Sequence, residues 1–325
     1  MTYALDWDRP HLPDDNPLWQ ESDCYWFFDR KTGIGGYHRI GQTPNQHRGN
    51  VMLNVFKLGG ARFRSLAEYS EADCMRDETS QQVGSSSAKS IDDMEMRFSW
   101  DEPGCAAELT FYESFYEPRD WVSPSQKSDG AAAVEKEMNT GGHLECSGRL
   151  RGVITIDGVS VEVDALAHRD RSWGIRDLRM AYQHRMVTGT VGPDLSWATF
   201  VMRLENGVAA HAGFVVRHGE AVDIERLETV TGFADDGLTV IDLRARLHLV
   251  GGEHVDLSGH AAEGFCAVTD GWLLSSHHYI EIGEMGFSVL DTTNRPSKGD
   301  YVPTPDEVLA VCIEDGLTPC GPYGE

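Results

Sequence analysis

The stretch GVITIDGVSVEV, residues 152–163, decides the fold class. Two runs rich in β-branched residues flank Asp157-Gly158, a dipeptide that two-residue hairpin turns favour. Similar runs, separated by turns rich in Gly, Asn and Asp, recur at residues 51–58, 94–100, 107–115, 187–191, 195–204, 209–217, 238–250 and 254–259. Strands at this spacing are typical of an all-β sandwich or barrel, and we predict two such domains that meet near residue 175.

Helical signals are sparse. Residues 65–75 are one candidate for a short helix, and a second candidate begins at Thr304, where Pro305 occupies the first turn. The stretches 85–90 and 122–130 are rich in Ser, Gly and Pro and are predicted to be loops. Residues 131–143 lie between two strand blocks, which favours a linker or a crossover.

The composition argues against several classes of partner. The 325 residues include 52 acidic and 28 basic side chains, which gives a net charge of −24 at pH 7. Nucleic acids and anionic membranes are bound through clustered cations, so neither is expected. No run of about 18 apolar residues occurs, and the first ten residues do not resemble a signal peptide. The seven cysteines form no C-x-x-C pair, which favours reduced thiols in a cytoplasmic protein.

Three short motifs are interpreted as coincidences. Residues 33–41 (GIGGYHRIG) resemble a dinucleotide-binding loop, but they follow a hairpin turn and do not open a helix. Residues 86–89 (SSAK) and 31–33 (KTG) match motifs of serine acyl-transferases in the reverse chain order. The thirteen histidines include no H-x-H or H-E-x-x-H spacing. We therefore expect neither a cofactor nor a metal ion.

The segment HRDRSWGIRD, residues 168–177, is the most unusual in the chain because of its density of charge. A strand would divide it between two faces: one with His168, Asp170 and Ser172, the other with Arg169, Arg171 and Trp173. The face with His168 and Asp170 could offer an acid–base pair, since imidazole and carboxylate tune each other's pKa. The alternative is a structural Arg–Asp network at a domain junction, with Trp173 as filler.

Four further stretches mix aromatic and polar side chains. Residues 21–29, together with 37–39, could line an apolar ligand site or form a core strand. On residues 111–117, Glu113 shares a face with Phe111 and Phe115, where its pKa would rise and suit a general acid; the alternative is a Glu in solvent. Residues 180–186 and 275–281 are more typical of a barrel surface than of a site.

Two motifs carry a family resemblance. The N-terminal motif comprises YWFFD (25–29), GGYHRIG (35–41) and Pro44-Asn45. The mid-chain motif comprises SGRLRG (147–152), Gly158 and HRDRSWGIR (168–176), with a basic-Asp-x-Ser-Trp-Gly core. In this order they resemble the hydroxyneurosporene synthase-like superfamily, also called AttH-like, and the mid-chain motif is the more specific of the two.

The resemblance implies two calycin-like domains with few short helices. They are an N-terminal β-sandwich at residues 1–175 and a C-terminal lipocalin-like β-barrel at residues 176–325. The superfamily includes carotenoid hydratases, a phytoalexin hydratase, and relatives of tocopherol cyclase and of decalin-forming Diels–Alderases. Its members mostly act on terpenoid or polyketide skeletons without a redox cofactor. We therefore expect a cofactor-independent lyase, isomerase or cyclase with a lipophilic substrate in a cavity at the domain junction.

On that basis we expect proton transfer by Asp170 with His168, and Glu113 or Asp23 as the second carboxylate. If Asp170 is tied to an arginine, Glu113 becomes the better acid. Aromatic faces would stabilise a cation, and Arg39 or Arg176 would orient a polar group. The expected substrate-binding residues are Trp26, Tyr37, Arg39, Trp173, Arg176, Tyr116, His184, His277 and Tyr279.

Two other functions stay open. A non-catalytic carrier of a hydrophobic small molecule needs only a lipocalin-like cavity, and an accessory protein would have that cavity filled by side chains. Formation of a homodimer is open as well. Of these three functions, only an enzyme needs a carboxylate with a raised pKa that points into the site. Separate substitutions of Asp170, Glu113 and Asp23 therefore distinguish the functions, because they would abolish turnover by an enzyme and leave ligand binding by a carrier intact.

Overall fold

A computed structural model describes residues 5–92, 94–120, 141–175, 181–204, 209–235, 239–269, 273–294 and 318–320. The chain divides into two compact units. The first unit contains Met1–Asp120 and Lys136–Asp177, and the second contains Trp121–Glu135 and Leu178–Glu325. The second helix candidate (from Thr304), the loop at 122–130 and Arg176 lie outside the described residues.

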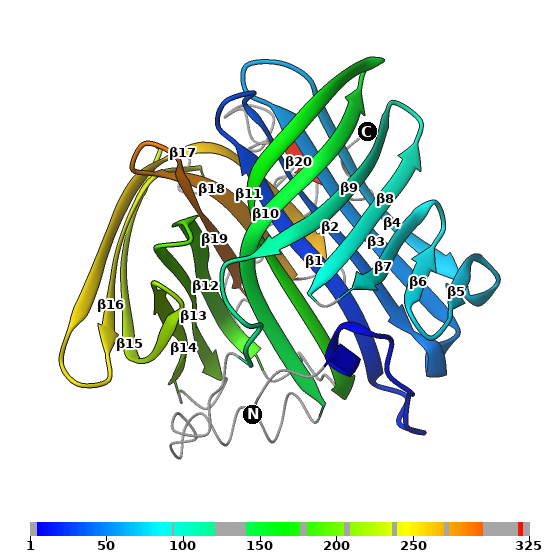
Figure 1. The fold of residues 1–325 in the computed structure, drawn as a ribbon, viewed down its shortest axis with the longest axis horizontal. Coiled ribbons are helices and arrows are strands. Elements are labelled where there is room, and N and C mark those ends of the chain that lie inside the picture. Colours follow the sequence, from blue (N-terminus) through cyan, green and yellow to red (C-terminus); the bar gives the residue numbers. More distant parts are fainter. Residues whose placement is uncertain are drawn as a thin grey trace. The chain divides into compact units, whose positions relative to one another are not determined.

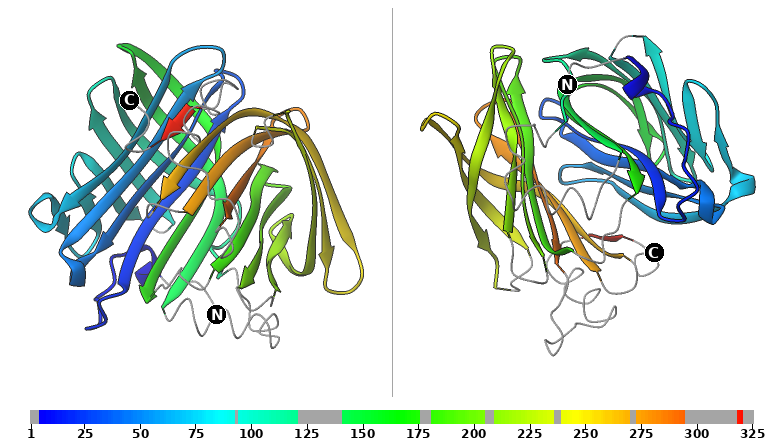
Figure 2. Two further views of the ribbon diagram at one scale, coloured as in Figure 1. Left: turned by 180° about the vertical axis from the view of Figure 1, so that it is seen from behind. Right: turned by 90° about the horizontal axis from the view of Figure 1, so that it is seen from below.

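The first unit is built on one antiparallel sheet (Figures 1 and 2). Its eleven strands follow the order β4-β3-β2-β1-β11-β10-β9-β8-β7-β6-β5. They are β1 (Trp19–Asp29), β2 (Ile34–Thr43), β3 (Arg48–Lys57), β4 (Arg62–Ser70), β5 (Cys74–Arg76), β6 (Ser80–Val83), β7 (Ser86–Asp92), β8 (Glu95–Glu102), β9 (Cys105–Ser114), β10 (Gly142–Ile156) and β11 (Val159–Ile175). The predicted hairpin joins β10 to β11, and both turn residues, Asp157 and Gly158, have the positive φ that this turn requires.

This sheet curls until strands distant in its order face each other. The ring centroids of Tyr25 on β1 and Phe98 on β8 are 4.1 Å apart, although three strands separate them in the sheet. His38 on β2 and Trp100 on β8 meet in the same way, at 5.0 Å. These contacts define an inner face, lined by buried aromatic rings, and an outer face on the alternate residues of each strand.

The second unit is a closed barrel. Strands β12–β19 form a ring because β16 pairs with both β15 and β17, and the short β20 adds to β17 in parallel. The strands are β12 (Ala181–Gly192), β13 (Leu195–Leu204), β14 (Ala209–Arg217), β15 (Glu220–Phe233), β16 (Val240–Leu249), β17 (His254–Thr269), β18 (Leu273–Ile282), β19 (Gly286–Asn294) and β20 (Thr318–Cys320).

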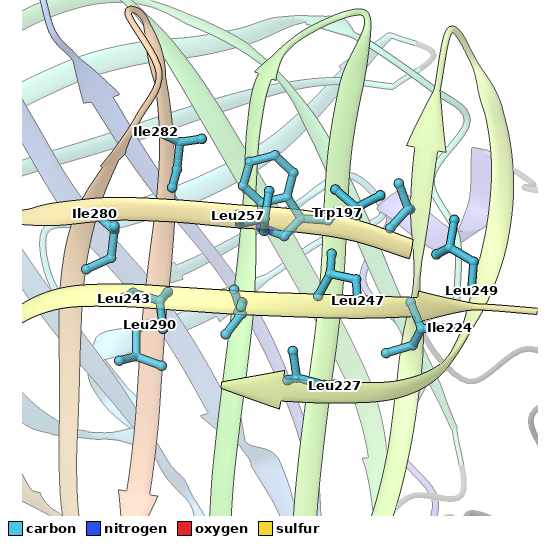
Figure 3. Close-up of a cluster of buried hydrophobic side chains, with 14 of the residues drawn as sticks. Trp197, Ile224, Leu227, Leu243, Leu247, Leu249, Leu257, Ile280, Ile282 and Leu290 are labelled. Carbon is cyan, nitrogen blue, oxygen red and sulfur yellow. The ribbon is translucent and has the colours of Figure 1, made fainter. Parts of the chain in front are cut away.

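Apolar side chains fill the interior of this barrel (Figure 3). Trp197, Leu247 and Ile280 are fully buried at its centre. Strands from every part of the ring contribute to this cluster, including Val187 on β12 and Leu290 on β19. Burial of an apolar side chain stabilises the fold by roughly 1.5–3 kcal/mol, so the interior acts as the hydrophobic core of the unit.

The all-β prediction is confirmed, and the helix predicted at residues 65–75 is wrong. That stretch continues edge strand β4, passes a 3₁₀ turn at Glu71–Asp73 and enters β5. Backbone pairing of β4 with β3 outweighs the local preference for a helix. The described residues contain no α-helix, only 3₁₀ turns at Leu5–Asp8, Pro44–Gln46 and Glu71–Asp73. No helix of the described chain is long and apolar enough to cross a membrane.

Candidate functional site

Four neighbouring strands of the first unit, β2, β1, β11 and β10, align their outer-face side chains in rows. Cross-strand pairing gives three consecutive rows: Gly41, Ser22, Ser172 and His143; Arg39, Cys24, Asp170 and Glu145; Tyr37, Trp26, His168 and Ser147. The hydrogen bond of 3.2 Å between the Ser22 and Ser172 hydroxyls shows that neighbouring members of a row meet. The rows therefore gather imidazoles, carboxylates and aromatic rings on one face of the sheet.

A chain of hydrogen bonds links the ionisable members of these rows. The His143 Nε2–H donates to Asp170 Oδ2 at 2.7 Å, and Glu145 Oε1 lies 3.2 Å from the same nitrogen. The other oxygen of Glu145 accepts from His168 Nε2. His168 Nδ1 lies 2.8 Å from the Ser147 hydroxyl. We call Asp170, His143, Glu145, His168 and Ser147 the relay.

Tyr116 extends the relay at its far end. Its hydroxyl lies 3.4 Å from Ser147 Oγ. Burial raises the pKa of Tyr116 well above its usual value, so the phenol keeps its proton and can donate. With Tyr116 donating to Ser147, and Ser147 to His168 Nδ1, the remaining Nε2–H of His168 points to Glu145. A single direction of donation thus satisfies this end of the relay.

The electrostatics of the relay centre on His143. Burial disfavours its charged form, but the carboxylates of Asp170 and Glu145 outweigh that effect and raise the pKa of His143 to about 9. The side chain of Asp170 is 11% exposed, whereas those of His143, Glu145 and His168 are at most 3% exposed. Asp170 is therefore the relay residue most open to a ligand, and a buried positive charge lies directly behind it.

The same residues offer a donor set that some metals use. His143, Glu145 and Asp170 each present one ligand atom, and the three atoms lie within 4.8 Å of one another. One imidazole and two carboxylates suit Zn²⁺ or Mn²⁺. In this arrangement the imidazolium of His143 supplies the positive charge between the two carboxylates.

Aromatic and thiol groups border the relay. The rings of Trp26 and Tyr37 stack with centroids 5.0 Å apart, and Trp26 lies 6.3 Å from the His168 ring. Cys24 is buried between Arg39 and Asp170 in its row. Burial and the nearby Asp170 carboxylate raise the pKa of Cys24 well above its usual value, so the thiol stays neutral. The side chains beside the relay are thus buried and largely apolar.

The alternate residues of β11 form a separate ion network on the inner face. Arg171 binds both oxygens of Asp23 at 2.6 Å and Glu21 at 2.6 Å. Arg169 pairs with Asp8 in the N-terminal 3₁₀ turn. One face of β11 thus contributes His168 and Asp170 to the relay, and the other contributes Arg169 and Arg171 to an arginine–carboxylate network.

Two predicted catalytic carboxylates lie outside the relay. Asp23 is on the inner face, where burial raises its pKa and Arg171 opposes the shift. Glu113 is exposed near the end of β9, where the pairing of β9 with β10 changes register beside Arg149. The strand alternation that would place Glu113 with Phe111 is broken by this irregularity. The second carboxylate beside Asp170 and His168 is Glu145.

Trp173 also lies apart from the other predicted aromatic residues. It is on the inner face of β11, stacked on His11 with ring centroids 3.8 Å apart, and 6.2 Å from Trp7. His11 donates in turn to Glu21. Trp173 therefore closes the end of the ion network, as the filler interpretation expects.

The three predicted residues of the second unit share the outer face of its barrel. His277 and Tyr279 alternate with the core residue Ile280 on β18, and His184 alternates with Val187 on β12. Burial lowers the pKa of His277 to about 3, so its approach to Asp291 at 3.4 Å is that of a neutral imidazole. These side chains do not belong to the filled interior.

Sequence reasoning missed His143 and Glu145. Both lie on β10, more than 20 residues before His168, and His143 is the last residue of the stretch interpreted as a linker or a crossover. The available signal was the hairpin itself. Counting pairs outward from Asp157-Gly158 places Ser147 opposite His168, Glu145 opposite Asp170 and His143 opposite Ser172.

Comparison with known proteins gives both a family and a fold. A family model described as "Domain of unknown function (DUF7064)" matches residues 4–296. No curated protein matches the sequence. Among solved structures, a putative AttH from Nitrosomonas europaea has a TM-score of 0.61 at 11% identity, covering 87% of this chain and 95% of that chain.

Two further structures share the fold. The structure of CghA with Sch210972 has a TM-score of 0.59 at 13% identity, covering 85% of this chain and 88% of that chain. Kievitone hydratase from Nectria haematococca has a TM-score of 0.57 at 11% identity, covering 85% of this chain and 88% of that chain. The resemblance to AttH-like proteins is thus confirmed at the level of the fold.

Proposed function

Because the chain belongs to the DUF7064 family and has the fold of a hydratase, we propose that it is a cofactor-independent lyase, isomerase or cyclase. Its substrate is a lipophilic small molecule of terpenoid or polyketide type. The relay carries this proposal, because it combines a partly exposed carboxylate with a buried, charged imidazole and a second imidazole–carboxylate pair. A protein that only holds an apolar ligand needs none of these groups.

Asp170 exchanges a proton with the substrate in this proposal. His143 holds Oδ2 of Asp170, and 11% of the Asp170 side chain is exposed, which gives a ligand access to the carboxylate. When Asp170 takes up a proton, the relay compensates the change of charge through His143, which lies between two carboxylates. The faces of Trp26 and Tyr37 stabilise positive charge that develops on the substrate.

The barrel interior argues against the carrier alternative. A lipocalin-like carrier holds its ligand inside the barrel, whereas here Trp197, Leu247 and their neighbours occupy that space. Close-packed interiors leave few voids larger than a water molecule. The proposal therefore places the ligand at the relay, on the first unit.

Native mass spectrometry of protein purified without detergent tests the proposal. Any retained lipophile is extracted, identified and incubated with the enzyme in deuterated water containing EDTA. We expect a product that has gained deuterium or the elements of water, or an isomer with a new retention time. The Asp170→Asn variant should keep the ligand and lose at least about 100-fold of the turnover, the usual contribution of a general acid or base.

Glu113→Gln is the matched control, because Glu113 is exposed and outside the relay. It should leave turnover unchanged. Equal turnover by wild type, Asp170→Asn and His168→Asn would contradict the proposed mechanism. A bound lipophile that the wild-type protein never changes would instead favour the carrier.

A further inference from the structure

Arg39 is a half-buried arginine whose hydrogen-bond partner is neutral. Its guanidinium donates to the neutral Asn50 Oδ1, and no described carboxylate lies within ion-pair distance of it. Seven other arginines of the described residues each contact a carboxylate: Arg76, Arg149, Arg169, Arg171, Arg217, Arg226 and Arg246. Arg185 is a comparable case on the barrel, where it donates to Thr229 Oγ1, so what sets Arg39 apart is its place in the same row as Asp170.

Two neighbours hold this guanidinium in place. Asn50 accepts its hydrogen bond from β3, and Gly41 lies beneath it on β2. A Cβ at Gly41 would lie 2.7 Å from Nη1 and 3.0 Å from Nη2 of Arg39. The guanidinium therefore occupies the space that a side chain at position 41 would take, and its position is fixed without an ion pair.

Arg39 lies in the same row as Asp170, with Cys24 between them. Two strand spacings separate their backbones, about 10 Å. The side chains between them are the neutral Cys24 thiol and, in the next row, the stacked Trp26 and Tyr37, all three buried. A ligand that lies along this row would meet a fixed cation, then an apolar stretch, then the partly exposed carboxylate of the relay.

We propose that Arg39 binds a carboxylate of the substrate, so that the substrate is a lipophilic carboxylic acid. The inference rests on the proposed function and names its substrate class. A guanidinium matches a carboxylate with two parallel hydrogen bonds, which suits a single planar anion. Within the three rows Arg39 is the one guanidinium, so one negative charge is the complement. The reacting carbon then lies about 10 Å from the acid group, beside Asp170.

Binding of three matched probes tests this inference. Dodecanoate, dodecan-1-ol and methyl dodecanoate have the same chain and differ in the head group. Affinities are measured by isothermal titration calorimetry on the full-length protein. We expect the wild-type protein to bind dodecanoate at least about tenfold more tightly than the alcohol or the ester, the effect of one charge-assisted contact.

Three variants locate the preference. Arg39→Met should bind all three probes alike, and Gly41→Ala should weaken dodecanoate binding because it displaces the guanidinium. Arg97→Met is the matched control, since Arg97 is exposed on β8, and it should behave as wild type. If Arg39→Met does not fold, Asn50→Ala serves in its place.

Several outcomes would overturn the inference. The first is equal affinity of the wild-type protein for dodecanoate and dodecan-1-ol. The second is no binding of dodecanoate up to millimolar concentration. The third is a loss of dodecanoate affinity in Arg97→Met as large as the loss in Arg39→Met. Asp170→Asn separates the two proposals. This variant should keep the preference for dodecanoate and lose turnover. A carboxylate preference in a wild-type protein that never changes its ligand would support the Arg39 site and contradict the enzyme. Turnover by a wild-type protein without that preference would support the enzyme and contradict the Arg39 site.

Discussion

The titration of His143 can be tested without knowledge of the substrate. Its pKa is raised from 6.5 to about 9 because Asp170 and Glu145 outweigh the cost of burial. At 1.36 kcal/mol per pKa unit, the difference of about 2.5 units corresponds to about 3 kcal/mol of folding free energy. Below pH 6.5 the folded and unfolded states both hold the proton, and this stabilisation is complete. Between pH 6.5 and 9 the unfolded state loses the proton first, so the stabilisation declines and is lost above pH 9.

Nuclear magnetic resonance of protein with ¹⁵N-labelled histidine side chains measures this pKa directly. The His143 signal is the one absent from the His143→Gln variant. We expect its midpoint near pH 9 in the wild-type protein and a lower one in Asp170→Asn. His277, whose pKa burial lowers to about 3, should show no transition between pH 5 and 10.

Urea unfolding at pH 6 and pH 9 supplies the free energies. The stability difference between wild type and His143→Gln should shrink by about 3 kcal/mol over this range. A His143 midpoint at or below pH 6.5, or a difference between the two proteins that does not change with pH, would refute the assigned charge. The assignment of a charged His143 between two carboxylates would then be wrong. The proton balance proposed for the relay would be wrong with it.

Three further predictions concern other parts of the molecule. Arg171→Met should lower the free energy of unfolding by about 3–5 kcal/mol, because it leaves the buried carboxylates of Asp23 and Glu21 without their shared partner. Adding Asp23→Asn to it should restore part of that loss, and no recovery would contradict the ion-network account. Leu247→Ala should cost about 2–5 kcal/mol in thermal or urea unfolding, because Leu247 is fully buried in the barrel core; a neutral effect would mean a loosely packed interior. In protein purified without a chelator, elemental analysis should find far less than one zinc per chain, since the histidines show none of the usual zinc-ligand spacings; stoichiometric zinc would make His143, Glu145 and Asp170 a metal centre.

The alternation along β11 could be predicted from the sequence. Strand period alone assigns His168 and Asp170 to one face and Arg169 and Arg171 to the other, and the structure has this division. The Asp157-Gly158 turn was equally clear, because few dipeptides tolerate two positive φ angles in succession. Local chemistry determined both features, so a single sequence sufficed for them.

The partners across the sheet could not be predicted with the same ease. Glu113 lies on a strand whose register shifts opposite Arg149, and no sequence pattern signals that irregularity. Asp23 shares a strand with Cys24 and Trp26 but faces the other way, and the choice of inward face depends on how the whole sheet curls. One register step exchanges the two sets of residues. The division of β11 into two faces therefore followed from the sequence, whereas the partners of each face on the neighbouring strands did not.

The two faces of β11 impose different selective pressures on adjacent codons. Substitutions at 169 and 171 alter the charges that hold the inside of the sheet together, so variants there should be lost as insoluble or degraded protein. Substitutions at 168 and 170 touch the relay instead, and variants there should lose turnover by a larger factor than they lose abundance. Saturation mutagenesis of this one strand would then yield a ratio of activity to abundance that oscillates with a period of two. An engineer seeking a new reaction could randomise the even positions and leave the odd ones untouched.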